Sequence, residues 1–160
     1  MHRTVQGIRV ERATLDEFQI AYEIVAEYYE VLSVVARETP QEFRREYFAR
    51  ASGVWLARVG PNLAGCIALR EMRKGEAGEI KRMYVREVYR GLGVAQKLLA
   101  EAESFARGIG YRRIFLDSTD GMQAAVRLYE RNGYERCERY NRNPQATIFM
   151  SKHLKDRTSL

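Results

Sequence analysis

The glycine-rich segment Arg90-Gly91-Leu92-Gly93-Val94-Ala95 lies between a strand-like run over 79–85 and an amphipathic pattern over 94–108. A turn that opens a helix in this way presents backbone N–H groups without partners at the positive end of the helix dipole. The glycines let the main chain approach an anion closely, and Arg90 adds a charged donor. The segment therefore predicts a site for the phosphate or pyrophosphate of a cofactor.

The patterns on either side of this segment predict one α/β domain over 1–160 with a mixed sheet. Thr14 and Glu17 form a capping-box pattern that starts a first helix near Leu15, and Pro40 opens a second. The expected strands cover 8–11, 54–59, 63–70, 79–85, 113–117, 134–140 and 146–152, and the later helices cover 94–108 and 122–132.

Charge and hydropathy exclude some classes of protein. The net charge is +6, from 27 basic and 21 acidic residues, which suits an anionic ligand. The basic residues are scattered along the sequence, so we expect no nucleic-acid partner. The sequence contains no apolar run long enough to cross a membrane, and its first residues lack the apolar core of a signal peptide. We therefore expect a cytoplasmic protein without a membrane partner.

Metal binding is not predicted. Cys66 and Cys137 lie far apart, and His2 and His153 stand near the two ends of the chain. No pair has the close spacing of zinc ligands. Cys66 stands in an apolar strand pattern and is expected to be a small core residue.

The glycine segment fits only one of three patterns for phosphate loops. A Walker loop needs a Lys-Ser/Thr pair, and a dinucleotide fingerprint needs a third glycine where Gln96 stands. The pattern Arg/Gln-x-x-Gly-x-Gly/Ala does fit, with Arg90, Gly93 and Ala95. Here the chain resembles the GCN5-related N-acetyltransferase (GNAT) family. The resemblance extends to the strand over 79–85 and to the segment over 125–134, which is similar to the family's A-x-x-L-Y-x-x-x-G-F segment.

This resemblance implies a fold and a cofactor. The implied fold is a single GNAT-like domain whose mixed, mostly antiparallel sheet has about six or seven strands and is flanked by about four helices. The implied cofactor is acetyl-coenzyme A, which leaves as coenzyme A. The main chain of Met83, Tyr84 and Val85 would pair with the pantetheine arm like an added strand. The pyrophosphate would be held by the segment Arg90, Gly91, Leu92, Gly93, Val94, Ala95 and Gln96.

A departure from the family occurs at Met122, a further cofactor-binding position. Many members carry an asparagine there, so the polar contact is either lost or supplied by a neighbour such as Ser118, Thr119 or Gln123.

The resemblance also implies two catalytic residues. Tyr129 matches a tyrosine that can protonate the departing coenzyme A thiolate. Met122, Val126 and Tyr129 also share one face of the expected helix, so core packing is the alternative role. A tyrosine can combine a packed ring with a hydroxyl at the site.

Glu79 matches a carboxylate that accepts the proton of the amine acceptor, which is mostly protonated at neutral pH. Strand alternation would place Glu79, Lys81, Met83 and Val85 on one face of the sheet. The alternative is that Glu79 only pairs with Lys81 or Arg82 on the sheet surface.

The acceptor is expected on the side of the N-terminal helices and the last two strands. Tyr29 is a candidate acceptor contact there. Arg142, in a Tyr140–Pro144 stretch that resembles part of some small-molecule GNAT enzymes, is a candidate for binding a carboxylate, with a solvated loop arginine as the alternative.

We therefore expect an N-acetyltransferase that acts on a primary amine of a small molecule or amino acid in a ternary complex. A protein N-terminus or lysine as acceptor, and a non-catalytic coenzyme A sensor, remain alternatives. A homodimer is left open.

Overall fold

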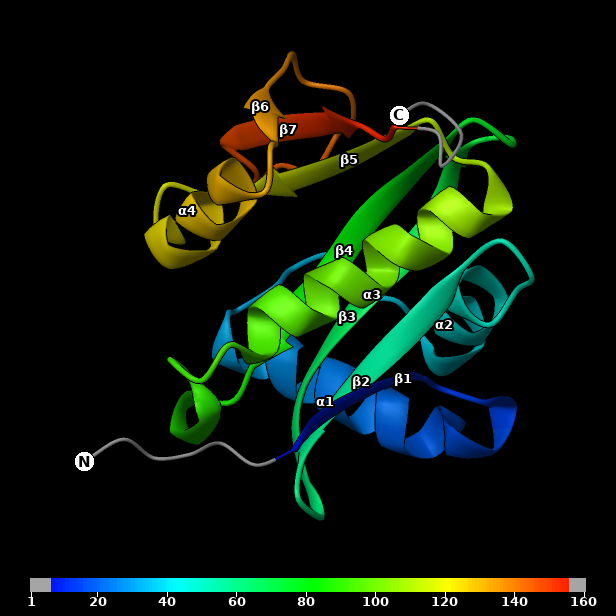
Figure 1. Ribbon diagram of the computed structural model, residues 1–160, viewed down its shortest axis with the longest axis vertical. Helices are drawn as coiled ribbons and strands as arrows, with labels where there is room; N and C mark the ends of the chain where they lie inside the picture. Colours follow the sequence, from blue (N-terminus) through cyan, green and yellow to red (C-terminus); the bar gives the residue numbers. More distant parts are fainter. Residues whose placement is uncertain (1–6, 156–160) are drawn as a thin grey trace.

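The computed structural model describes residues 7–155, which form one seven-stranded sheet with helices on both faces (Figure 1). The strand order is β1-β2-β3-β4-β5-β7-β6, and only the β4–β5 pair is parallel. The strands are β1 Ile8–Arg12, β2 Gly53–Val59, β3 Asn62–Arg73, β4 Ala77–Val85, β5 Arg113–Ser118, β6 Glu135–Arg136 and β7 Ile148–His153.

The helices begin where the sequence provides caps. Glu17 accepts a hydrogen bond from the Thr14 amide, and a single 3-10 turn, η1 Leu15–Glu17, leads into α1 Phe18–Val31. Thr39 caps α2 Pro40–Tyr47 by accepting from the Glu42 amide at 3.2 Å. The remaining helices are the 3-10 turn η2 Glu87–Tyr89, α3 Val94–Ile109 and α4 Gln123–Arg131. The expected domain with four α-helices is thereby confirmed within residues 7–155.

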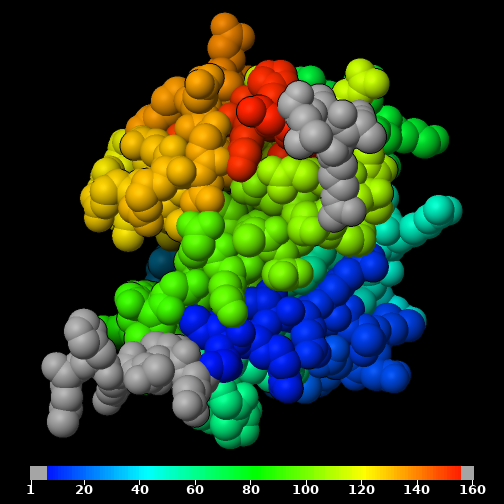
Figure 2. Space-filling model, viewed as in Figure 1, coloured from blue at the N-terminus to red at the C-terminus, as the bar shows by residue number. Residues whose placement is uncertain are grey.

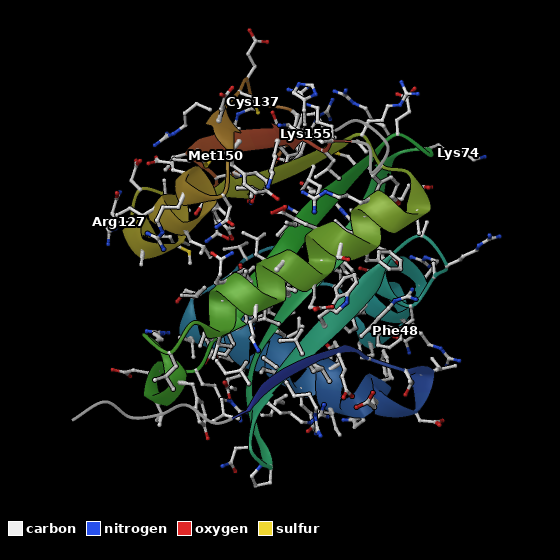
Figure 3. All side chains as sticks on the ribbon, in the orientation of Figure 1. Phe48, Lys74, Arg127, Cys137, Met150 and Lys155 are labelled. Carbon is white, nitrogen blue, oxygen red and sulfur yellow. The ribbon has the colours of Figure 1, made fainter. Side chains whose placement is uncertain are left out.

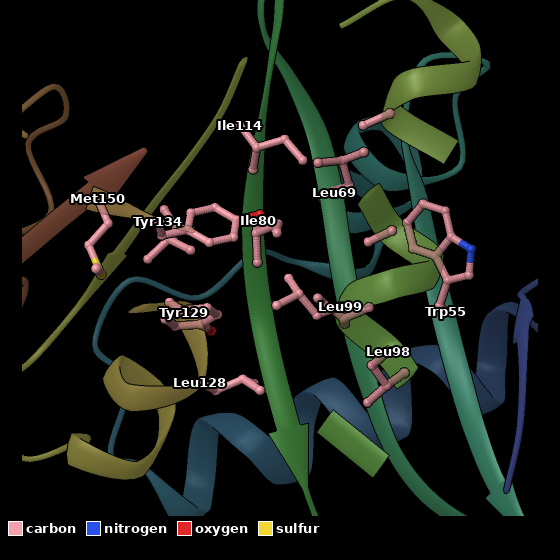
Figure 4. Packing of buried hydrophobic residues seen from close by; sticks show 14 of the residues in the cluster. Trp55, Leu69, Ile80, Leu98, Leu99, Ile114, Leu128, Tyr129, Tyr134 and Met150 are labelled. Carbon is pink, nitrogen blue, oxygen red and sulfur yellow. The ribbon is translucent and has the colours of Figure 1, made fainter. Parts of the chain in front are cut away.

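Two hydrophobic clusters hold the helices against opposite faces of the sheet. One joins α3 and α4 to the sheet and includes Trp55, Leu69, Leu99 and Ile114 (Figure 4). The other joins α1 and α2 to the opposite face and includes Ile24, Phe43, Leu56 and Cys66. Burying a side chain of this size contributes about 1.5–3 kcal/mol, so both clusters anchor their helices firmly.

The parallel strands β4 and β5 separate part-way along their length. Their pairing begins at Ala77 with Arg113 and ends at Ile80 with Leu116. Beyond this point β5 continues to pair with β7 up to Ser118, whereas β4 continues beside β3 up to Val85. The edge of β4 that faces β5 is therefore open from residue 81 onward, and this opening positions the site.

The expected strand over 134–140 is wrong for most of its length, because only β6 Glu135–Arg136 is a strand. The next residues leave the sheet as a loop. Arg139 stabilises that loop by donating to the carbonyl oxygens of Asn143 and Ala146, both at 3.1 Å. A side chain that bonds the main chain in this way replaces the ladder that a strand would need.

Across residues 7–155, no helix combines the length and the apolar character needed to cross a membrane.

Candidate functional site

The glycine loop leaves a run of backbone donors unused. Gly91 and Gly93 have φ values of +78° and +87°, which only glycine adopts without strain, and an added Cβ would meet no atom within 4 Å at either position. Among the described residues, no acceptor bonds the amides of residues 91–96, and the first helical bond runs from Lys97 to the Gly93 carbonyl. These donors stand at the N-terminus of the 16-residue helix α3. The loop therefore has the geometry of an anion site.

This loop forms one end of a cleft of about 570 Å³ between α3 and α4. Figure 2 shows the notch between the yellow surface of α4 and the green surface that precedes α3. Ten of the predicted cofactor residues line the cleft: Met83, Tyr84, Val85, Arg90, Gly91, Gly93, Val94, Ala95, Gln96 and Met122. Leu92 does not line it, because its side chain packs against the core beneath α3.

The cleft is also shaped by two contacts that the sequence did not reveal. Gln96 and Asn132 exchange two amide hydrogen bonds of 2.9 Å, which tie the start of α3 to the end of α4 across the opening. The Arg90 guanidinium turns back to donate to the Val85 carbonyl at 3.0 Å. Arg90 therefore joins the end of β4 to the loop, and its charge stays exposed beside the free amides.

A bulge in β4 overturns the expected alternation along this strand. Tyr84 lies opposite Cys66, whereas Lys81 lies opposite Ala68, so β4 has one extra residue against β3. Arg82 takes up this extra residue with φ of +56°. Glu79 and Lys81 therefore share the α1 face, whereas Met83 and Val85 pack toward α3. The prediction that all four side chains share one face is wrong, because a bulge shifts the side-chain period by one residue.

Arg82 is held in this conformation by a buried ion pair. Both oxygens of Glu38 accept from Arg82 Nη2 at 2.7 Å, and the Tyr29 hydroxyl also bonds this carboxylate. Burial alone would raise the pKa of Glu38, but the Arg82 charge and these hydrogen bonds lower it. The pair joins the α1–α2 connection to the bulge, and it therefore holds the open edge of β4 in place.

Glu79 lies almost fully buried, with 1% of its side chain exposed, on the α1 face of β4. Its Oε1 accepts from Arg70 Nε at 2.9 Å. Its Oε2 accepts from the Tyr140 hydroxyl at 2.6 Å and from Asn141 at 3.1 Å, with Lys81 Nζ at 3.4 Å. Both oxygens of the carboxylate are thus paired, and one of the donors, Tyr140, is half-buried.

Asp117 continues this charged cluster onto β5. It pairs with Lys81 Nζ at 3.0 Å and accepts from Asn141 at 2.6 Å. Burial by itself would raise the pKa of Asp117, but Lys81, Asn141 and Asn143 together lower it. Asp117 is therefore ionised at neutral pH, and the cluster joins β3, β4, β5 and the loop after β6.

Tyr129 lies on α4 with its ring in the core beside Leu128 and Tyr134 (Figure 4). The ring is 4% exposed and packs edge-on against Tyr134 at 5.7 Å between centroids. Burial raises the pKa of Tyr129, with smaller contributions from Tyr28 and Asp117. Among the described residues, no group hydrogen-bonds its hydroxyl, so that group is protonated and available as a donor.

The two predicted acceptor contacts lie in different environments. Tyr29 is 2% exposed, and its hydroxyl is engaged by Glu38. Arg142 is exposed in the loop before β7 and forms no side-chain hydrogen bond or ion pair within residues 7–155. The structure therefore does not bring these two side chains together.

Sequence reasoning expected the Tyr140–Pro144 stretch on the acceptor side, but it did not predict which residues contact Glu79 and Arg82. Arg70, Tyr140 and Asn141 surround Glu79, and Glu38 supports Arg82. Arg70, Tyr140 and Asn141 lie 9, 61 and 62 positions from Glu79 in the sequence, and Glu38 lies 44 positions from Arg82. The one usable signal was the charge of Glu79 inside a strand pattern, because a buried carboxylate needs cationic or hydrogen-bonding partners.

The sequence matches the acetyltransferase (GNAT) family over residues 18–134. The chain belongs to the GNAT family. The chain is 36% identical over 105 residues to the uncharacterized N-acetyltransferase YsnE of Bacillus subtilis, an alignment that covers 62% of this chain and 68% of that protein. It is 36% identical over 80 residues to an uncharacterized N-acetyltransferase of Schizosaccharomyces pombe, covering 50% of this chain and 49% of that protein. The chain thus spans about half the length of the yeast relative.

Solved structures share the GNAT fold. A GNAT acetyltransferase from Staphylococcus aureus superposes with a TM-score of 0.78 at 19% identity, covering 93% of this chain and all of that one. N-acetylglutamate synthase from Neisseria gonorrhoeae, complexed with coenzyme A and L-arginine, superposes with a TM-score of 0.69 at 19% identity over 92% of this chain and 33% of that one. At these identities the likeness shows the fold, which confirms the predicted GNAT-like domain.

Proposed function

We propose that this chain is an acetyl-coenzyme A-dependent N-acetyltransferase that acts on a primary amine of a small molecule or amino acid. The observation that carries the proposal is the run of unpaired amides over residues 91–96 at the end of a cleft beside an open strand edge. Backbone donors and a helix N-terminus fit a pyrophosphate, and an open strand edge fits an extended arm with amide groups. When bound, the thioester of acetyl-coenzyme A supplies the acetyl group.

The donor side is formed by the lining residues of the cleft. The amides from Gly91 to Gln96 would hold the pyrophosphate, and the main chain of Met83 to Val85 would pair with the pantetheine arm. Met122, at the start of α4, offers an apolar contact instead of a polar one. A main-chain N–H near Met83 would stabilise negative charge on the reacting carbonyl oxygen.

Tyr129 would donate its hydroxyl proton to the departing thiolate. Its raised pKa keeps the phenol protonated at neutral pH, so it can act only as a donor. A raised pKa also makes it a weaker acid, and its contribution would come from its fixed position on α4 rather than from acidity.

Glu79 would receive the proton of the acceptor amine through Tyr140. The carboxylate itself is buried, but the Tyr140 hydroxyl donates to Oε2 at 2.6 Å, and Tyr140 as a residue is only half-buried. The amine would pass its proton to Tyr140 Oη while Tyr140 passes its own proton to Glu79 Oε2. Arg70 and Lys81, which pair with the carboxylate, would hold the Glu79 side chain in position for that transfer.

This proton transfer from the amine through Tyr140 to Glu79 is tested by measuring kcat as a function of pH in Tyr140→Phe. We expect kcat to fall and its acidic limb to disappear, because loss of the Tyr140 hydroxyl would break the path from the amine to the Glu79 carboxylate. Arg136→Gln, at an exposed residue of β6 shortly before the loop of Tyr140, serves as the control and should retain the limb. An unchanged profile in Tyr140→Phe would remove Glu79 and Tyr140 from the proton path.

The overall function is tested by calorimetric titration with acetyl-coenzyme A followed by an amine panel read by thiol release. We expect binding at one site per chain and thiol release with small amines. Binding without release from any small amine, peptide N-terminus or peptide lysine would indicate a coenzyme A sensor. Absence of binding would overturn the proposal.

A further inference from the structure

A second cavity of about 540 Å³ lies at the opposite end of the sheet from the glycine loop. It is lined by Arg73, Arg113, Phe115 and the segment 137–140, and it shares no lining residue with the donor cleft. Arg73 stands at the end of β3 and Arg113 at the start of β5, beside the first residues of β4. The glycine loop, in contrast, comes after the other end of β4, beyond the turn η2.

Two guanidinium groups gather around one aromatic ring in this cavity. The Arg73 and Arg113 guanidiniums lie 4.9 and 4.4 Å from the centre of the Phe115 ring. Within residues 7–155, neither forms an ion pair with a carboxylate. Elsewhere in the domain, Arg70, Arg82 and Arg86 each bind one. Arg113 is half-buried, and among the half-buried arginines of residues 7–155 it alone has no carboxylate partner, whereas Arg73 is exposed.

Arg113 also has a donor without a use. Its Nη2 donates to Ser151 at 2.8 Å, while its Nε is buried and has no hydrogen-bond partner among the described residues. A buried donor left in this way costs free energy unless a ligand satisfies it. A guanidinium stacked on a ring keeps its edge free, and that edge matches the two oxygens of a carboxylate or phosphate.

The remaining lining charges leave the cavity positive. Arg139 lies 4.6 Å from the centre of the Phe149 ring and uses its donors on carbonyl oxygens of the loop, so its charge has no acidic partner within the described part of the chain. Glu138 is the single acid among the lining residues. Its carboxylate is exposed and pairs with no cation in residues 7–155. The lining of the cavity therefore carries three guanidiniums and one carboxylate.

The cavity borders the proposed acceptor side through one side chain. Tyr140 lines the cavity and also donates to Glu79. We propose that this cavity binds the carboxylate or phosphate group of the acceptor, with Arg73 and Arg113 as its binding residues. The acceptor is then an anionic amine whose amino group lies toward Tyr140. This inference rests on the proposed N-acetyltransferase function.

The kinetic test compares propylamine, β-alanine and phosphoethanolamine as acceptors. We expect one of the anionic amines to have a KM at least about tenfold below that of propylamine, because charge-assisted hydrogen bonds contribute that much. Arg113→Gln should raise that KM about tenfold, without changing the KM of acetyl-coenzyme A or of propylamine. Arg112→Gln makes the same charge change at an exposed neighbour outside the cavity and should behave like wild type. Equal KM values for the three amines, or equal effects of the two variants, would overturn the proposal.

A binding test uses a thiol that lies in the cavity. Cys137 lines it near β6 and β7 (Figure 3), and Cys66 is 0% exposed, so iodoacetamide should modify Cys137 first. Inorganic phosphate or β-alanine should slow alkylation in a saturable manner in wild type and Arg112→Gln, but not in Arg113→Gln. Chloride at equal ionic strength is the control.

The two readouts separate the two proposals. Protection of Cys137 without thiol release from any amine would contradict the acetyltransferase function but leave the anion site intact. Thiol release without protection by either anion would support the function and overturn the anion site.

Discussion

Within residues 7–155, the loop over 91–96 leaves six consecutive amides without partners, whereas the cluster around Glu79 pairs both oxygens of its carboxylate. Both regions lie next to β4, one at its end and one near its start. The loop is exposed at Gly91 and Gly93, and the cluster is buried at Glu79. The difference follows from access to water.

An exposed amide can be hydrated until a ligand replaces the water, so leaving it unpaired costs little. A buried carboxylate has no such substitute, and it must be paired within the protein. Changes in the loop should therefore reduce ligand affinity with a modest loss of stability. Changes in the Glu79 cluster should reduce stability directly.

The largest expected effect is on stability in Glu79→Gln. Removing this charge leaves Arg70 and Lys81 facing a neutral group, and breaking a buried ion pair costs about 3 kcal/mol. Urea unfolding should show this loss, whereas Glu101→Gln, exposed on α3, should change stability by less than about 0.5 kcal/mol. Equal stability of the two variants would contradict the claim that changes in the Glu79 cluster reduce stability directly.

The next effect concerns turnover in Tyr129→Phe. We expect kcat to fall about 100-fold, since a positioned proton donor contributes at least that much, while the ring keeps its packing. Steady-state kinetics and calorimetry should show lower kcat with unchanged affinity for acetyl-coenzyme A. Tyr134→Phe, which removes a hydroxyl from the ring packed against Tyr129, is the control and should keep its turnover. A Tyr129→Phe variant with wild-type kcat would leave the residue with packing alone.

A smaller effect is expected from Gly93→Ala in the loop. The residue would need a left-handed conformation that costs about 1–2 kcal/mol, and relief of this strain would move the free amides. We expect the Kd of acetyl-coenzyme A to rise about tenfold. Gly108→Ala, inside α3 with open space around it, makes the same substitution without this strain and should retain binding. Equal affinities would show that the loop does not position the donor.

The smallest effect is a dependence of stability on pH. Glu38 and Asp117 have pKa values below their ordinary range, so the unfolded chain binds more protons at acid pH. Their stabilisation is complete above the ordinary value of about 4 and is lost as pH falls toward the folded values. The free energy of unfolding should be measured by urea unfolding at several pH values. Below about pH 4, it should fall less steeply with decreasing pH in Asp117→Asn than in wild type. An equal or steeper dependence of the unfolding free energy on pH in the variant would exclude a contribution from Asp117.

Local features were predicted well because their causes lie within a few residues. The Thr14–Glu17 capping box, the helix start at Pro40 and the glycine turn that opens α3 each follow from residues within one or two turns of the chain. The strand over 134–140 was wrong because Arg139 bonds the following loop, a contact that no strand pattern encodes.

The surroundings of Glu79 and the bulge at Arg82 were beyond sequence reasoning. The Arg82 bulge is bonded by Glu38, which lies 44 positions away in the α1–α2 connection, and Tyr140 reaches Glu79 across 61 positions. Such contacts depend on strand order and register, which are set by the packing of the whole sheet.

The amino-acid sequence alone determined that a glycine turn would open α3 with free donors, because glycine conformations and helix ends are local properties. Tertiary structure alone decided which charges meet, which side chains the bulge turns toward α3, and where arginines gather without carboxylates. Those outcomes require distant residues to be brought together by burial of the two hydrophobic clusters, and no short stretch of sequence contains that information.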